Sequence, residues 1–310
     1  MENKEITEGN RFLWLDVAKG ITILLMILGH TSIPQYISNF IFAFHMPLFF
    51  FASGWCTNWR RYSFIPFIKR KFKSLFMPFF LYSITVILIA GLIGRNDLSI
   101  KNVIRNGWLG YALWFVPVLF LSLILARSIM LFSQAWVRYT LCGILLLLGV
   151  LLKVHHIYLP WTLSTVPYAT CLLLLGSSLK KFQDYVNNPK LWIFAVGLLL
   201  TLLISQKWRL DLAWNSIIPV TLLTIGAVSG TLMMFTLSSW LTRIAPLSKV
   251  FQVIGKETFI ILAFSQILGE MVQFFYPTSK PFEYAAMFLL LTIMVLLKNG
   301  INRLIGFKLI

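Results

Sequence analysis

Acidic residues are scarce in this chain: 10 Asp and Glu stand against 27 Lys and Arg over 310 residues. Charged residues of both signs make up only 12% of the chain, against about 25% in soluble domains. Apolar residues make up 58%, and they fall into runs long enough to cross a bilayer. This composition excludes a soluble globular domain, because the core of one such domain cannot bury so much apolar surface.

Cysteine is also rare. Cys56, Cys142 and Cys171 are odd in number, far apart and set in apolar stretches, which excludes a disulfide framework. No metal site is expected either, because the adjacent histidines at 155–156 have no carboxylate or cysteine companions. The net charge of +17 does not indicate nucleic-acid binding, since the basic residues are dispersed between apolar runs rather than gathered in a solvated patch.

Hydropathy predicts an all-α polytopic membrane protein with about ten transmembrane helices. The expected spans are 12–32, 38–56, 74–94, 111–131, 139–153, 161–179, 190–206, 214–236, 255–275 and 284–301. The loops between them are short. We therefore expect a single integral-membrane domain over residues 1–310.

The distribution of basic residues orients these spans. An even number of spans places both termini on the same side of the membrane. If that side is the cytoplasm, most Lys and Arg residues lie there, as the positive-inside rule predicts. One cytoplasmic segment would hold six cations and no acid, namely Arg60, Arg61, Lys69, Arg70, Lys71 and Lys73. The sequence thus predicts a multi-pass protein of the cell (plasma) membrane with cytoplasmic termini.

The first span carries two ionisable residues, Lys19 and His30. Such residues cost roughly 2.5–3.5 kcal/mol in hydrocarbon and usually face a protein interior or a watery cavity. Eleven helical residues return to within about 20° of the same face and rise about 16 Å. Asp16 lies three residues before Lys19 and can pair with it on that face. We expect this stripe to line a polar passage.

The second span runs back inward and carries His45, with Pro47 two residues further on. His45 and His30 then lie at comparable depth in neighbouring antiparallel spans. A packing histidine bonded to a nearby carbonyl is the alternative interpretation, and it carries more weight for His45 than for His30. Pro47 is expected to kink the helix and free one backbone carbonyl.

These features suggest a two-ended site. Cations near Lys19 would attract a polyphosphate such as the nucleotide head of coenzyme A, and a thioester arm would reach toward the histidines. Imidazole suits either a general base for a hydroxyl or a transient acyl carrier. A transporter or flippase for a lipid-linked sugar or small anion, with a proton-relay histidine, would show the same elements.

Several motifs, in order, resemble one family. The run at 14–20 with Leu28-Gly29-His30, and the run at 44–54 containing His45-Met46-Pro47, are similar to the integral-membrane acyltransferase-3 family. Weaker echoes follow at 113–117, 166–176 and 255–258. Within the family, the chain most resembles the stand-alone sugar O-acetyltransferases of the fucose-4-O-acetylase type, whose usual architecture has ten spans.

The resemblance implies transfer of an acyl group, usually acetyl from cytoplasmic acetyl-CoA, to a hydroxyl of a surface polysaccharide or its lipid-linked precursor. His30 matches the family's catalytic histidine, and Lys19 matches a cation that is commonly arginine. We expect His45 either to orient His30 or to stabilise the developing negative charge. The family's paired arginines match imperfectly, because their positions hold Lys71 and Ser74 here. Arg70 and Lys73, each one residue earlier, are the expected substitutes. We expect Lys19, Arg70, Lys71 and Lys73 to bind the CoA phosphates. Asp16 is expected to orient Lys19 in this site. Ser265 stands where a histidine is common and receives no role.

Acyl-CoA, a glycan or lipid-linked glycan and membrane lipid are thus the expected partners, and a homo-oligomer is compatible with the sequence. No second copy of the Lys19–His30 or His45–Pro47 pattern occurs, which favours an enzyme over a transporter built from repeated halves. The acceptor hydroxyl, the acyl chain, the membrane face of transfer and the exact role of His30 stay open.

Overall fold

The computed structural model describes residues 12–108, 111–277 and 279–305, and within these ranges the regular structure is entirely helical. Eight helical segments among them are long and apolar enough to cross a membrane. They are Gln35–Cys56 (α2), Phe64–Leu92 (α3), Ala112–Ile129 (with α5, Phe115–Ile129), Ala135–Val154 (α6), Pro160–Asn187 (with α7, Val166–Leu179, and α8, Gln183–Asn187), Val220–Leu241 (α10), Thr258–Phe275 (α12) and Lys280–Gly300 (in α13, Lys280–Ile305). The prediction of an all-α polytopic membrane protein is confirmed.

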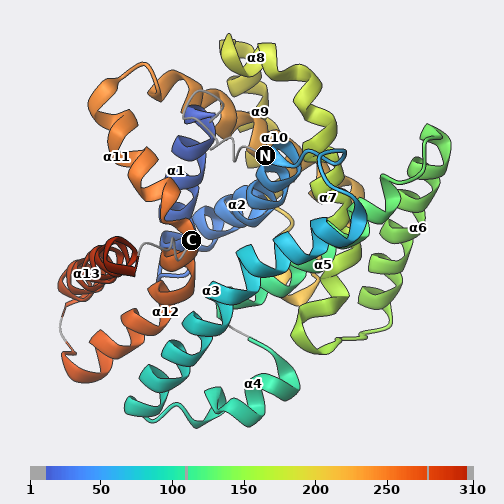
Figure 1. The fold of residues 1–310 in the computed structure, drawn as a ribbon. Coiled ribbons are helices and arrows are strands. Elements are labelled where there is room, and N and C mark those ends of the chain that lie inside the picture. Colours follow the sequence, from blue (N-terminus) through green and yellow to red (C-terminus); the bar gives the residue numbers. More distant parts are fainter. Residues whose placement is uncertain (1–11, 109–110, 278, 306–310) are drawn as a thin grey trace.

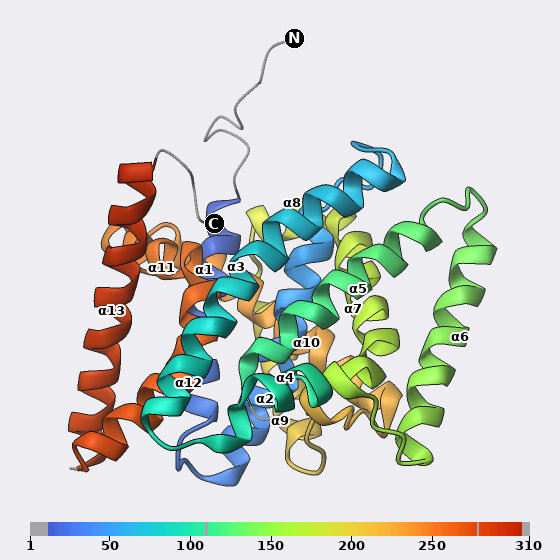
Figure 2. The same ribbon diagram turned by 60° about the horizontal axis from the view of Figure 1, so that its bottom comes forward.

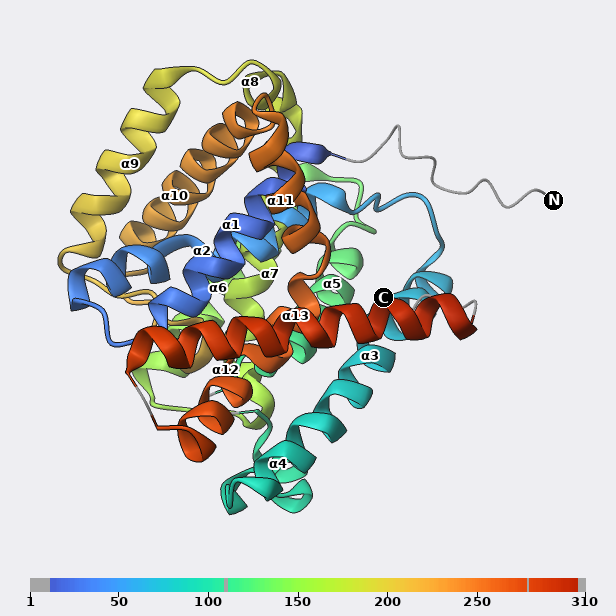
Figure 3. The ribbon, with the colours of Figure 1, turned by 90° about the vertical axis from the view of Figure 1, so that its left-hand side faces the viewer.

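Two shorter helices lie where the other two spans were expected. They are α1 (Leu13–Gly29) and α9 (Leu191–Ser205), and α9 packs along α10 (Figure 3). The helix that carries the third expected span is longer than that span, because α3 begins at Phe64. The first turns of α3 contain both apolar residues and cations. The mean hydropathy of this stretch is therefore low, and a hydropathy window does not detect that it is helical. The cations at 69–73 therefore lie on a helix rather than in a loop.

The bundle has two ends, which Figure 2 shows as its top and bottom. We call the first the polycationic end; it carries the connections at 57–63, 130–134 and 180–190 and helix α11 (Ala245–Lys256). The other, the histidine end, carries the connections at 30–34, 93–99, 155–165 and 206–219. His30 and Lys19 lie toward opposite ends because they stand eleven residues apart on one helix.

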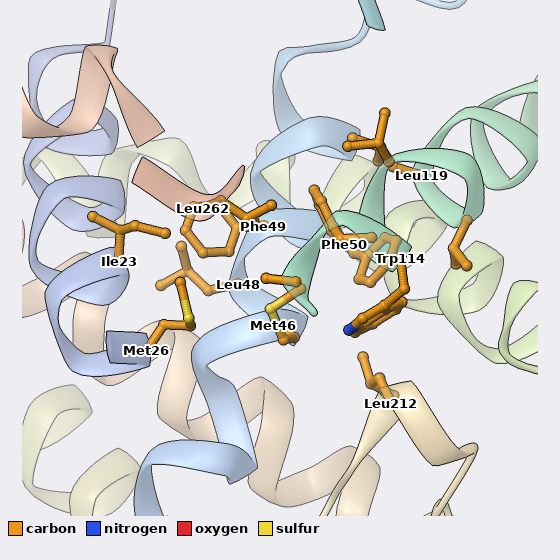
Figure 4. Close-up of a cluster of buried hydrophobic side chains, with 14 of the residues drawn as sticks. Ile23, Met26, Met46, Leu48, Phe49, Phe50, Trp114, Leu119, Leu212 and Leu262 are labelled. Atoms are coloured by element: carbon orange, nitrogen blue, oxygen red, sulfur yellow. The ribbon is translucent and has the colours of Figure 1, made fainter. Parts of the chain in front are cut away.

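Helices α1 and α2 lie at the centre of the bundle, whereas α6 and α13 stand at its edges (Figure 1). Exposed apolar side chains such as Ile144 and Leu147 cover α6, as expected of a lipid-facing helix. Apolar side chains from α1, α2, α5 and α12 meet in the middle (Figure 4), among them Ile23, Met26, Leu48, Phe49, Phe50, Leu119 and Leu262.

Three helices were not predicted from the sequence, α4 (Ile100–Asn106), α8 and α11. The amphipathic α11 packs against α1 through paired glycines. A Cβ on Gly255 would lie 1.8 Å from the Asp16 carbonyl oxygen, and one on Gly20 would lie 2.1 Å from that of Phe251. Small residues let membrane helices approach this closely. The contact holds α11 against the part of α1 that carries Asp16 and Lys19.

A second glycine contact joins α2 to α7. A Cβ on Gly54 would lie 1.9 Å from the Leu173 carbonyl oxygen, and one on Gly176 would lie 2.3 Å from that of Phe51. In each case the obstructing atom belongs to a helix backbone, which cannot rotate aside. The helix positions around α1 and α2 are thus fixed by backbone contact.

We predict that Gly255→Ala and Gly176→Ala each destabilise the protein by about 1–3 kcal/mol, the usual cost of overpacking. Gly143→Ala on α6 is the matched control, because a Cβ there meets nothing within 4 Å and Ala is the better helix former. Thermal unfolding of the purified protein in detergent measures all three. Equal melting temperatures for Gly255→Ala and Gly143→Ala would contradict the close-contact account.

Candidate active site

The structure brings His30 and His45 together at the histidine end. His30 directly follows α1 and is solvent-exposed, whereas His45 lies inside α2 and is only 2% exposed. Their ring centroids are 6.1 Å apart and the ring planes cross at 83°. The short connection between α1 and α2 places the two rings at the same level, as antiparallel neighbours require.

Each histidine is held by its own helix. His30 Nδ1 lies 2.8 Å from the Met26 carbonyl oxygen, and His45 Nδ1 lies 3.0 Å from that of Ile41. A carbonyl oxygen only accepts, so Nδ1 must carry the proton and donate it in both bonds. In the neutral ring this leaves Nε2 with a lone pair. Both side chains therefore present a basic nitrogen away from their own backbone.

A cation lies beside the two imidazoles. Arg209, from the connection between α9 and α10, places its guanidinium carbon 3.5 Å from the Phe42 ring centroid. That ring lies 5.2 Å from the His30 ring and 4.7 Å from the His45 ring. Arg209 also donates to Ser38 Oγ at 2.9 Å and to Asn39 Oδ1 at 3.3 Å. Stacking and hydrogen bonds together fix the planar guanidinium.

Asp211 balances this charge. Its carboxylate lies 3.8 Å from Arg209 Nε and accepts a hydrogen bond from the Ala213 backbone N–H at 3.1 Å. Burial raises the pKa of Asp211 above its ordinary value, while the nearby Arg209 opposes that shift. The same connection thus places one positive and one negative group next to the histidines.

These groups line a hollow of about 690 Å³, which we call the histidine hollow. Its wall includes Met26, His30, Phe42, His45, Met46, Tyr111, Ala112, Trp114, Arg209, Asp211, Ala213, Trp214 and Gln266. Sequence reasoning counted Arg209 only as a topology signal and did not single out Asp211 or Gln266. The sequence signal that could have indicated these residues is the triplet at 209–211, Arg-Leu-Asp, which places two opposite charges in a short connection between spans.

His30 also borders a second hollow of about 920 Å³ between α1, α12 and α13, the lateral hollow. Glu270 on its wall accepts hydrogen bonds from Arg95 at 2.5 Å and from the Tyr111 hydroxyl at 2.7 Å. Glu283 accepts from Lys280 at 2.8 Å. Both carboxylates are therefore compensated. His30 stands where the two hollows adjoin.

A third hollow, of about 960 Å³, opens near the polycationic end, and we call it the cationic hollow. Lys19 and Lys71 line it, and Lys19 forms an ion pair with Asp16 at 2.7 Å. Arg70 and Lys73 are exposed and do not line it. Arg70 instead donates to the Tyr62 hydroxyl at 2.8 Å. Of the cations predicted to bind one ligand, the structure brings only Lys19 and Lys71 together.

The cationic and histidine hollows are close neighbours along the same helices. On α2 the first is lined by Phe49 and the second by Met46; on α12 the corresponding residues are Leu262 and Gln266. Each pair is about one helical turn apart. Figure 4 shows the side chains of Met46, Phe49 and Leu262 in the cluster at this level. A thin apolar layer thus separates the two hollows.

Comparison with known proteins agrees with this architecture. The chain matches the model of the acyltransferase domain, acyltransferase 3, over residues 12–297. It belongs to the acyltransferase-3 family. No curated protein and no solved structure gives a match. The match extends from α1 into α13, so this acyltransferase is a membrane enzyme whose family domain includes all three hollows.

Proposed function

We propose that this acyltransferase moves an acyl group, most simply acetyl, from acyl-CoA to a hydroxyl of a cell-surface polysaccharide or its lipid-linked precursor. The observation that carries the proposal is the arrangement of two neighbouring hollows. One is lined by two lysines, and the other is lined by an exposed histidine whose Nε2 is left free by its Nδ1 hydrogen bond. The same helices line both hollows, which are separated by about one helical turn of apolar side chains. A donor with a charged head and a reactive far end fits this arrangement.

Lys19 and Lys71 would bind the CoA phosphates in the cationic hollow, with Asp16 orienting Lys19 at 2.7 Å. The neutral pantetheine arm would then run along α1, where Lys19 and His30 are separated by about 16 Å of helix rise. Side chains such as Phe49 and Leu262 would have to rotate to admit it. Binding-induced opening of this kind is common in enzymes.

The chemical step follows from the tautomer of His30. Nε2 removes the proton from the acceptor hydroxyl as its oxygen attacks the thioester carbonyl carbon, giving a tetrahedral oxyanion. The carbon–sulfur bond then breaks, and the departing CoA sulfur takes the proton from Nε2. The ester stays on the acceptor. A histidine acyl carrier is the alternative, with the acyl group passing through Nε2.

Two neighbours would assist this step. Arg209, fixed by Phe42 and Ser38, places positive charge near the developing oxyanion, and preorganised charges of this kind often contribute most to catalysis. His45 is buried against the His30 site and would position its ring. Asp211 would balance the charge of Arg209 and help to hold the guanidinium in place beside His30.

We place the polycationic end in the cytoplasm, where acyl-CoA is available, in keeping with the positive-inside rule. The protein would lie in the plasma membrane with both termini cytoplasmic; the termini themselves fall outside the described residues. Lys71→Cys, in a background without the three native cysteines, should react with an impermeant maleimide only after permeabilisation. Labelling in intact cells would overturn this orientation.

We predict that Lys19→Ala weakens acetyl-CoA binding at least tenfold, because the variant loses a charged partner of the phosphates. Lys19→Arg should keep most of the affinity, since the charge is retained. Isothermal titration of purified protein measures both. Lys73→Ala is the matched control, because Lys73 is exposed and does not line the hollow. Equal losses of acetyl-CoA affinity for Lys19→Ala and Lys73→Ala would contradict the proposed phosphate site.

We predict that His30→Ala lowers acyl transfer by about 10²–10⁴-fold, the usual contribution of a positioned acid–base group. Acetyl-CoA affinity should stay close to that of the wild type. CoA release in the presence of candidate glycans measures the first quantity, and titration measures the second. His45→Ala should reduce the rate less and also lower the melting temperature, because His45 is fully buried in α2.

Arg209→Ala tests the oxyanion role. It should lower the rate constant for transfer and leave acetyl-CoA affinity unchanged, whereas Arg209→Lys should recover only part of the rate, because lysine lacks the planar fork.

A folded His30→Ala protein with nearly wild-type transfer would exclude the site. Flux of a lipid-linked sugar without CoA release would instead establish the transporter alternative.

A further inference from the structure

A fourth hollow, of about 550 Å³, lies at the histidine end and plays no part in the acyl transfer described above. We call it the outer hollow. The connection at 155–165 and the connection at 206–219 form most of its wall, which includes Tyr158, Thr162, Trp214 and Asn215. None of the described residues that line it carries a charge. Ala213 and Trp214 line the histidine hollow as well, so the two hollows adjoin.

Two buried polar atoms in this wall have no partner. Thr162 Oγ1 and Asn215 Oδ1 form no hydrogen bond, although the two residues are only 5% and 2% exposed. Asn215 is nevertheless held in place, because its amide nitrogen donates to the Gly149 carbonyl oxygen at 3.1 Å. Buried polar groups are almost always satisfied in native proteins. Both residues belong to the wall of the outer hollow, so the hydroxyl groups of a ligand become their partners once these side chains turn toward it.

The backbone around the outer hollow is strained. In the described residues, positive φ outside glycine occurs only at His156, Trp161, Thr162 and Asn215, and all four lie in the two connections that form the hollow. Such conformations cost about 1–3 kcal/mol each and persist where the surroundings fix them. Here Thr165 Oγ1 ties one connection to the other by donating to the Leu212 carbonyl oxygen at 2.6 Å. The hollow is therefore a preformed feature.

Two aromatic side chains in its wall remain open to solvent. Trp214 is 49% exposed and Tyr158 is 52% exposed. Lys153 joins them, since its Nζ lies 3.4 Å from the Trp214 carbonyl oxygen and 3.5 Å from the Tyr158 hydroxyl. Aromatic faces pack against the C–H faces of pyranose rings, and nearby amide and hydroxyl groups pair with the equatorial hydroxyls. The chemistry of this wall matches an uncharged sugar.

We propose that the outer hollow is a subsite for a neutral sugar unit of the acceptor, next to the unit whose hydroxyl reaches His30. This rests on the proposed function. The sugar stacks on Trp214, and its hydroxyls bond to Thr162 Oγ1 and Asn215 Oδ1. A charged sugar is disfavoured, because no charged side chain lines the hollow itself and the neighbouring Lys153 already donates to Ser216, Tyr158 and the Trp214 carbonyl oxygen. The acceptor is then an oligosaccharide or longer chain rather than a single sugar.

Binding without any acyl donor tests this subsite directly. The probe is an immobilised panel of neutral and anionic mono- to tetrasaccharides, applied to purified full-length protein in detergent. Neutral oligosaccharides should be retained more strongly than monosaccharides. Trp214→Ala and Thr162→Val should each reduce that retention at least tenfold. Thr162→Val keeps the β-branched shape and removes only the hydroxyl, so it tests the unpaired Oγ1 itself.

Trp192→Ala on α9 is the matched control, because Trp192 is similarly exposed but does not line the hollow. It should bind like the wild type, and the absence of any acyl donor separates this subsite from the chemical step. A fall in retention for Trp214→Ala and Thr162→Val supports the proposal even if CoA release is never observed. Retention equal to that of the control, retention of anionic glycans only, or no retention by folded wild-type protein would each overturn it.

Discussion

The ion pair between Asp16 and Lys19 is the constraint on which the rest of the bundle depends. An ion pair on a spanning helix cannot face lipid, because uncompensated charge in hydrocarbon is costly. Helix α1 is accordingly enclosed: α2, α10, α11 and α12 pack around it. The glycine contact at Gly20 and Gly255 brings α11 within backbone distance of Asp16. The same enclosure leaves the stripe from Lys19 to His30 facing protein and hollow rather than lipid.

Much of this could be predicted from the sequence. Apolar runs locate the spans because a bilayer demands about twenty apolar residues per helix, and the family match supports the acyltransferase architecture. The proximity of His30 and His45 followed from helix periodicity and a short connection, both local properties. Lys19 and Asp16 were three residues apart, so their pairing also needed only local geometry.

The remainder depends on packing that local patterns do not encode. Arg209 and Asp211 reach the histidines from a connection well over a hundred residues away, and nothing near them in the sequence indicates where α9 and α10 end in space. Lys71 faces the cationic hollow while Arg70 and Lys73 do not, because successive helical residues point about 100° apart. Helix α11 escaped prediction since it is amphipathic and short, without a continuous apolar run.

Two hollows with an apolar layer between them suit a donor whose parts differ in polarity. The phosphates of acyl-CoA cannot enter the bilayer core at acceptable cost, whereas its neutral arm can. Lysines at one hollow would therefore hold the head where it is hydrated, and only the arm and its acyl group would pass Phe49 and Leu262. Both histidines donate Nδ1–H to a carbonyl of their own helix, but only His30 is exposed and borders both the histidine and the lateral hollow. Under the proposed function, that exposure decides which imidazole meets the acceptor.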